Sequence, residues 1–114
     1  MLGWSTQPPE IYLYNQPVDM RKQFDGLLAL VVSHYSLSQI RESGLIFAFI
    51  NRRRTHMKVL CYQSGGYCLW YKRLEQGTFQ RISGSDMVVL NSAQLQCLID
   101  GIYWQKDKQN KRLR

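Results

Sequence analysis

The chain has 114 residues, of which 45% are hydrophobic and 20% are charged, and its formal net charge is +7. This length suits one domain with one core, and this balance excludes a disordered protein. The three cysteines contain no Cys-x-x-Cys pair, which argues against a disulfide framework or a zinc knuckle.

The N-terminal third is expected to contain a strand and a helix. Residues 1–10 carry two prolines and are interpreted as a flexible leader, and residues 11–15 as a short strand. Asp19 is a natural N-cap, so a helix is predicted over 20–35. Its apolar residues recur at spacings of three and four, as a helix with one buried face requires. They are Met20, Phe24, Leu27, Leu28, Val31 and Tyr35. Gly26, inside this helix, indicates a close backbone contact.

The middle of the chain is expected to form an antiparallel meander over residues 45–82. A connector over 37–44, ended by Gly44, precedes it. The β-rich runs are residues 45–50, 57–62 and 67–74, with a fourth short strand at 78–82. Their connecting loops are so short that neighbouring strands must run antiparallel.

The second tight turn of the meander fixes the pairing of two strands. Gly65 and Gly66 are expected to supply the positive φ that this turn requires. If Tyr62 pairs with Tyr67, then Cys61 faces Cys68 across the ladder.

The C-terminal part is expected to form a short extended segment and a second helix. Ser92 is the predicted N-cap of a helix over 93–104, and residues 106–114 are predicted to be a disordered basic tail. The apolar stripe of this helix comprises Leu95, Leu98, Ile99 and Ile102. The chain therefore predicts a single α+β domain over residues 11–105.

Positive charge is concentrated in two blocks. Residues 44–82 hold seven basic residues and one acidic residue, and residues 101–114 hold five basic residues and one acidic residue. Clustered positive charge favours polyanions through counterion release, although it also fits solubility alone. Arg52, Arg53 and Arg54 occupy the tip of the first predicted hairpin, where topology exposes them. A basic β-ribbon can enter a DNA groove or bind phosphates without reading sequence.

The cations of the hairpins and tail form a candidate nucleic-acid site. Its members are Arg52, Arg53, Arg54, Lys58, Tyr71, Lys72, Arg73, Lys108, Lys111 and Arg112. Tyr71 is included because an aromatic ring beside two cations can stack on a base, whereas most aromatic residues of the meander are interpreted as core.

Three sequence blocks resemble one protein family. The blocks are VDMRKQFDGL, INRRRTHMKVLCYQSGGYCLWYKRLEQGTFQ and NSAQLQCLIDGIYW, in this order. They are similar to blocks of the TnpB accessory proteins of bacterial insertion-sequence-sixty-six type transposable elements, which are distinct from the RNA-guided nuclease of the same label. The resemblance implies an accessory role in transposition, beside a separate and larger transposase that carries the catalytic carboxylates. Its signature residues here are Asp19, Arg21, Lys22, Phe24, Asp25 and Gly26.

The potential catalytic groups do not converge in the predicted fold. Asp19 and Asp25 lie six residues apart and so on different sides of a helix, and an Arg21–Asp25 pair is the simpler interpretation of this signature. His34 and His56 lie on separate elements. We therefore expect no catalytic residue, no metal and no cofactor.

Two functions stay open at this point, with a small metal-dependent nuclease as a less favoured third. One is a DNA-binding accessory factor that acts alongside the transposase. The other is an adaptor that docks on the transposase without its own DNA affinity. The first ten residues do not resemble a signal peptide, and the longest apolar run is too short to span a bilayer, so a cytoplasmic location is expected.

Overall fold

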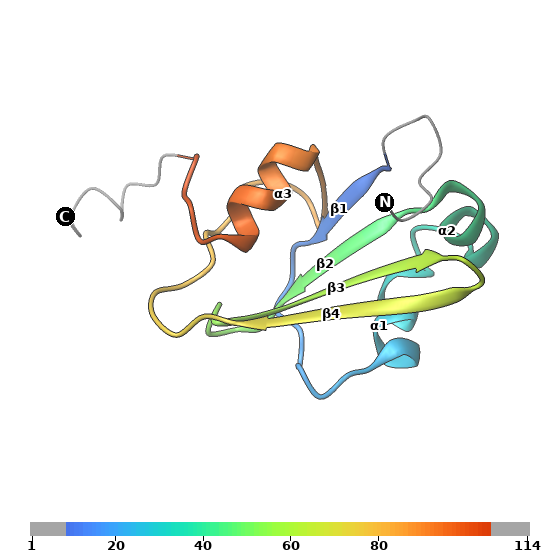
Figure 1. The fold of residues 1–114 in the computed structure, drawn as a ribbon, viewed down its shortest axis with the longest axis horizontal. Helices are drawn as coiled ribbons and strands as arrows, with labels where there is room; N and C mark the ends of the chain where they lie inside the picture. Colours follow the sequence, from blue (N-terminus) through green and yellow to red (C-terminus); the bar gives the residue numbers. More distant parts are fainter. Residues whose placement is uncertain (1–8, 106–114) are drawn as a thin grey trace.

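The computed structural model describes residues 9–105, so the predicted tail and most of the predicted leader lie outside it. This part of the chain forms a five-stranded sheet and three helices (Figure 1), which confirms the α+β class. The strands are β1 (Ile11–Tyr14), β2 (Ile46–Ile50), β3 (His56–Gln63), β4 (Gly66–Arg73) and β5 (Met87–Leu90). The helices are α1 (Phe24–Val31), α2 (Leu37–Ser43) and α3 (Ser92–Ile99).

The sheet has the strand order β4-β3-β2-β1-β5. Short loops make β2, β3 and β4 antiparallel neighbours, so the first three strands of the predicted meander are confirmed. The chain from β1 to β2 crosses over through α1 and α2, which makes that pair parallel. β5 then adds an antiparallel strand on the other side of β1. Every residue of β2 is buried, as a central strand requires.

Each face of the sheet has its own core, because alternate residues of a strand point to opposite faces. Ile46, Ala48 and Ile50 pack in the cluster that contains Leu98 of α3. The intervening residues, Phe47 and Phe49, pack in the cluster that contains the buried side chains of α1 and α2. The result is a sheet with α3 on one face and the other two helices on the opposite face.

The N-terminal helix is shorter than predicted, and Asp19 is not its N-cap. α1 begins at Phe24 after Gln23, which makes no side-chain cap. Asp19 Oδ1 instead accepts a hydrogen bond from the backbone N–H of Arg21 at 2.9 Å, within a turn that precedes the helix. A close contact is also found at Gly26, but it involves a side chain and not the predicted backbone. A Cβ at Gly26 would lie 3.2 Å from the side chain of Lys22.

The predicted connector over 37–44 is wrong, because residues 37–43 form α2. Ser36 and Gln39 make a reciprocal capping box at its start. The predicted stop at Gly44 is confirmed, with φ of +64° at the C-cap.

Two predictions for the C-terminal part are corrected. Residues 78–82 are irregular rather than a strand, although Phe79 and Ile82 are buried. α3 ends at Ile99 instead of 104, because Gly101 adopts a φ of +73° and lets the N–H of Ile102 bond the carbonyl of Cys97 at 2.8 Å. Ile102 is therefore 54% exposed rather than part of a buried stripe.

The local capping and turn details differ from the sequence expectations by one residue each. The N-cap of α3 is Asn91 rather than Ser92. The positive φ values of the β3–β4 turn fall on Ser64 and Gly65 instead of Gly65 and Gly66. The expected pairing is confirmed, with Cys61 opposite Cys68. In the described part of the chain, no helix has the length and apolarity needed to cross a bilayer.

Candidate nucleic-acid interface

The β2–β3 loop, residues 51–55, is a hairpin tip in which one asparagine bonds three backbone N–H groups. Asn51 Oδ1 accepts hydrogen bonds from the backbone N–H groups of Thr55 and His56, at 2.9 and 3.0 Å. The backbone N–H of Arg54 bonds the Asn51 carbonyl at 3.0 Å. Arg52 and Arg53, between these braces, are both exposed. The tip therefore presents two guanidinium groups to solvent from a fixed loop.

Arg54 turns inward, so the prediction that all three arginines are exposed is wrong. Its φ is +62°, and its Nε donates to the carbonyl of Phe79 at 2.8 Å. Its Nη2 donates to the carbonyl of Gln80. Burial lowers the pKa of Arg54, and the nearby charge of Arg81 lowers it further. Arg54 thus ties the irregular segment after β4 to the hairpin tip.

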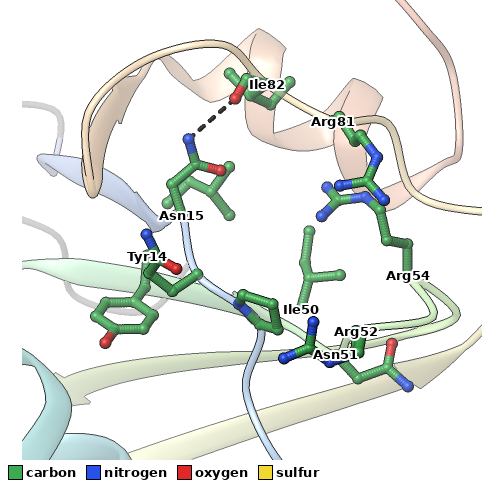
Figure 2. A pocket seen from close by; sticks show the side chains of 11 residues that line it. Tyr14, Asn15, Ile50, Asn51, Arg52, Arg54, Arg81 and Ile82 are labelled. Carbon is green, nitrogen blue, oxygen red and sulfur yellow. Dashed lines mark hydrogen bonds between the residues drawn. The ribbon is translucent and has the colours of Figure 1, made fainter.

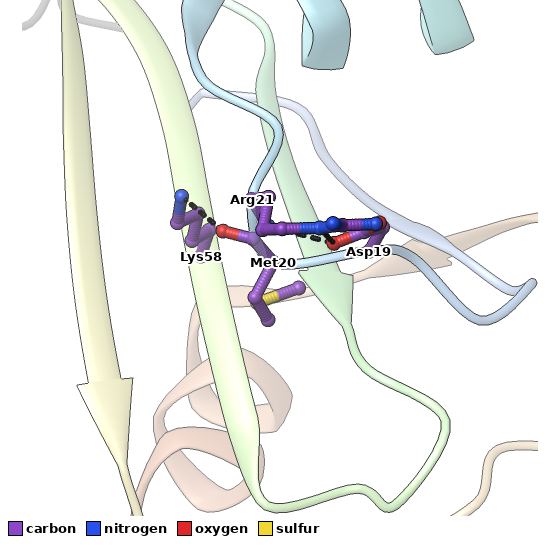
Figure 3. Close-up of polar contacts among 4 residues, drawn as sticks. All are labelled: Asp19, Met20, Arg21 and Lys58. Carbon is purple, nitrogen blue, oxygen red and sulfur yellow. Dashed lines mark hydrogen bonds and ion pairs between the residues drawn. The ribbon is translucent and has the colours of Figure 1, made fainter.

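Lys58 is also directed into the molecule rather than toward a ligand. Lys58 is 2% exposed, and its Nζ donates to the carbonyls of Met20 and Lys22 at 2.8 Å each. Figure 3 shows the first of these bonds, beside the Asp19–Arg21 pair. The ammonium also lies 4.8 Å from the ring centroid of Tyr71. The prediction that Lys58 is an exposed cation is wrong, because its ammonium is buried and donates hydrogen bonds to two backbone carbonyls.

Lys72 is engaged in a similar way on the opposite face of the sheet. Its Nζ donates to the carbonyl of Ile99 at 2.8 Å. Ile99 is the last residue of α3, where carbonyls lack helical partners and a cation is favoured. Lys72 therefore holds α3 against β4 instead of presenting its ammonium to solvent.

The remaining candidates on the body lie near the tip. Tyr71 is 53% exposed on β4, and its ring centroid lies 6.0 Å from that of His56. Arg73 is exposed at the end of β4, opposite His56 in the ladder. Lys108, Lys111 and Arg112 lie outside the described residues.

Arg81 joins this group although it was absent from the predicted site. It is exposed, and it lines a pocket together with Arg52 and Arg54. The sequence offers one indication of this role, because Arg81 belongs to the basic block over 44–82. The predicted strand over 78–82, which does not form, hid this indication. We call Arg52, Arg53, Tyr71, Arg73 and Arg81 the tip surface.

A pocket of about 290 Å³ opens beside the hairpin tip (Figure 2). Its walls come from the end of β1 and the following loop, from the start of the tip, and from the irregular segment at 81–82. Arg52, Arg54 and Arg81 supply three guanidinium groups, and no Asp or Glu is among the lining residues. Asn15 connects two of these walls, because its Nδ2 donates to the carbonyl of Ile82 at 3.0 Å. This arrangement suits an anion.

The signature residues form a turn and the start of a helix. Arg21 pairs with Asp19, with 2.7 Å between Nη2 and Oδ2, so the expected Arg21–Asp25 pair is corrected. The hydrogen bonds from Arg21 hold the pKa of Asp19 at about 2. Asp25 lies in the first turn of α1, where the helix dipole favours a carboxylate, and Phe24 is partly exposed. Within residues 9–105, no cluster of three or more His, Cys, Asp or Glu side chains could hold a metal ion.

Comparison with known proteins identifies the family. The model of the family described as "IS66 Orf2 like protein" matches residues 9–109. An uncharacterized protein of Sinorhizobium fredii, y4hO, is 29% identical over 109 residues, covering 95% of this chain and 93% of the relative. No solved structure matches the chain. The expected resemblance is confirmed: the chain belongs to the IS66 Orf2 like protein family, and its role is that of an accessory protein in insertion-sequence transposition.

Proposed function

We propose that the protein binds DNA, without cutting it, through the tip surface. The observation that carries this proposal is the orientation of Arg52 and Arg53, which the Asn51-braced loop holds in solvent beside a pocket lined by three arginines. Guanidinium groups in such a position contact phosphates and release counterions, which gives affinity that does not depend on sequence. Tyr71 and Arg73 are exposed on β4, and Arg73 pairs with His56 next to the tip.

The proposed role is non-catalytic, since the transposase of such elements is a separate protein. Asp19 is already bonded to both the backbone and the guanidinium of Arg21. The purified protein should therefore bind duplex DNA and leave it uncut when magnesium or manganese is added. Metal-dependent nicking that persists through purification and is lost in Asp19→Asn or Asp25→Asn would contradict this part of the proposal.

The central experiment is a salt titration of DNA affinity by fluorescence anisotropy. Replacing Arg52 and Arg53 with alanine should flatten the slope of log affinity against log salt by roughly 0.9 per lost contact, so by up to about 1.8 for duplex DNA. The fold should be retained, because exposed charges in a loop contribute little net stability. Arg54 is left in place, because it holds the carbonyls of Phe79 and Gln80.

The matched control is Arg41→Ala. Arg41 is an exposed arginine of α2 that contacts the Tyr67 hydroxyl at 3.3 Å, near the β3–β4 turn and so at the opposite end of these strands from the tip. Its removal should leave the salt slope unchanged. If Arg52→Ala/Arg53→Ala keeps the wild-type slope but abolishes transposition, the tip contacts a protein and the DNA-binding proposal fails. A loss confined to element-end DNA would instead indicate base reading in a groove.

The alternative is an adaptor that docks on the transposase, and the exposed apolar side chains of the edge strands favour it. Trp70 of β4 is 44% exposed and Val89 of β5 is 68% exposed. Co-purification of the tagged protein with its transposase, with and without nuclease, separates the two roles. A complex that survives nuclease supports the adaptor, whereas a complex lost on nuclease treatment supports a DNA tether.

A further inference from the structure

We infer that the three-arginine pocket beside the hairpin tip binds a phosphomonoester, such as the terminal phosphate of a DNA strand. This inference deepens the proposed function, and it rests on that proposal for DNA as the source of the phosphate. The inference itself is based on the pocket, and the exposed tip residue Arg53 is not among the residues that line it.

The charge of the pocket lacks a counter-charge among its lining residues. Arg52, Arg54 and Arg81 line it, and no carboxylate does. The guanidinium groups of Arg54 and Arg81 lie near each other in Figure 2, close enough that the charge of Arg81 lowers the pKa of Arg54 after the larger effect of burial. The carboxylate of Asp86 is not among the lining residues, and it accepts a hydrogen bond from Nε2 of the lining residue Gln16 at 2.7 Å. Two cations held together in this way are stabilised when an anion lies between them.

Arg54 is positioned in advance for such a ligand. Its Nε and Nη2 are used by the carbonyls of Phe79 and Gln80, which leaves Nη1 as the nitrogen that these carbonyls do not occupy. Because its guanidinium is already fixed, little side-chain entropy is lost when it binds. Arg52 and Arg81 add two guanidinium forks, whose geometry matches phosphate oxygens.

The size of the pocket favours a strand end over the side of a duplex. Its volume of about 290 Å³ is near the lower limit for small-molecule sites, which is roughly 300 Å³. A phosphate with part of a sugar fits such a space, whereas the phosphodiesters of a double helix stay at the mouth. A terminal phosphate also carries roughly 1.5 to 2 negative charges, which matches several arginines better than a single carboxylate does. Leu13, Ile50 and Ile82 give the lining an apolar part for a sugar.

The test compares two single-stranded oligonucleotides of one sequence, labelled at the 3′ end, with either a phosphate or a hydroxyl at the 5′ end. The full-length protein should bind the phosphorylated strand roughly tenfold more tightly, the factor expected for one charge-assisted hydrogen bond. Arg81→Gln should remove this preference. The control Arg53→Gln, outside the pocket, should weaken binding of both strands alike and keep the preference.

Inorganic phosphate provides a second measurement that requires no DNA. At constant ionic strength, replacing chloride with phosphate should raise the thermal midpoint of the wild type and of Arg53→Gln but not of Arg81→Gln. Phosphate stabilisation without an end preference supports the pocket and identifies a free phosphate compound as the source. The inference is overturned if the wild type shows neither effect, or if Arg81→Gln and Arg53→Gln behave alike. In either case the salt slope of the Arg52→Ala/Arg53→Ala variant still decides the proposed function separately.

Discussion

Some cations of the basic block bond inside the protein and others are exposed to solvent. Replacing Lys58, which is buried, tests this distinction most directly. Lys58→Met keeps the alkyl stem and removes the ammonium that donates to the carbonyls of Met20 and Lys22. Each hydrogen bond to a charged group contributes roughly 1.5–3 kcal/mol, and the relief of a buried charge offsets part of the loss. We expect a net destabilisation of about 2–4 kcal/mol, a large fraction of the roughly 5–15 kcal/mol typical of a domain.

Urea unfolding followed by tryptophan fluorescence and circular dichroism measures this loss. The matched control is Lys22→Met, which removes an exposed ammonium from the same turn and should change the free energy of unfolding by less than about 0.5 kcal/mol. If the two variants are equally stable, Lys58 does not brace the turn and the energetic reasoning fails.

The same variant separates structure from DNA contact. A phosphate contact by Lys58 would make Lys58→Met flatten the salt slope by roughly 0.9. Because the ammonium is buried, we expect an unchanged slope at temperatures where the variant is folded. A slope flattened by roughly 0.9 in Lys58→Met would refute the inward assignment.

Three further predictions concern local contacts. Asn91→Ala removes the N-cap of α3 and should cost about 1 kcal/mol in urea unfolding. In an NMR titration the Asp19 carboxyl should titrate with a pKa near 2, and Arg21→Gln should move this pKa up toward 3.8, because Arg21 is the main cause of the shift; an unmoved midpoint would contradict it. Burial raises the pKa of the Cys61 thiol, so iodoacetamide at neutral pH should alkylate the exposed Cys68 before Cys61.

The meander could be predicted because its determinants are local. Loops of a few residues leave β2, β3 and β4 no choice but antiparallel pairing, and the position of the turn fixes the register. The places of β1 and β5 depend on contacts between distant segments. β1 lies between β2 and β5, and no pattern within residues 11–15 specifies either neighbour.

The error at the first helix has a tertiary cause. Residues 20–23 carry the helical spacing, but the carbonyls of Met20 and Lys22 are occupied by Lys58 Nζ. Those carbonyls are the acceptors that a helix starting at 20 would use for its own N–H groups. The first bond of the observed helix runs instead from the N–H of Leu27 to the carbonyl of Gln23. The apolar spacing predicts a helix that begins at Met20. The contacts of Lys58 with the carbonyls of Met20 and Lys22 accompany a helix that begins at Phe24 instead.

The orientation of each cation in the candidate site also depends on its surroundings. Arg52, Arg53 and Arg54 are the same residue type, so the sequence does not distinguish them. In the structure Arg54 has a positive φ, and its side chain bonds the carbonyls of Phe79 and Gln80. Side chains of a strand alternate between its two faces, so Lys72 lies on the same face of β4 as Cys68 and Trp70. Its engagement with α3 was therefore partly foreseeable, but its carbonyl partner was not.

The inward cations set a limit on what the basic block over residues 44–82 can contribute to DNA affinity. Three of the seven basic residues in the block over 44–82 donate to backbone carbonyls of their own chain. The other four, Arg52, Arg53, Arg73 and Arg81, are exposed and belong to the tip surface. The exposed Arg73 also pairs with a carboxylate of its own chain, with 3.4 Å between its Nη2 and Oε2 of Glu75. At roughly 0.9 per contact, they support a salt slope of at most about 3.6 in magnitude. A steeper slope for the full chain would need cations beyond this block, and Lys108, Lys111 and Arg112 are the first candidates. A variant ended after Gln105 should then fall to that limit, and an unchanged slope in that variant would exclude the tail as the source.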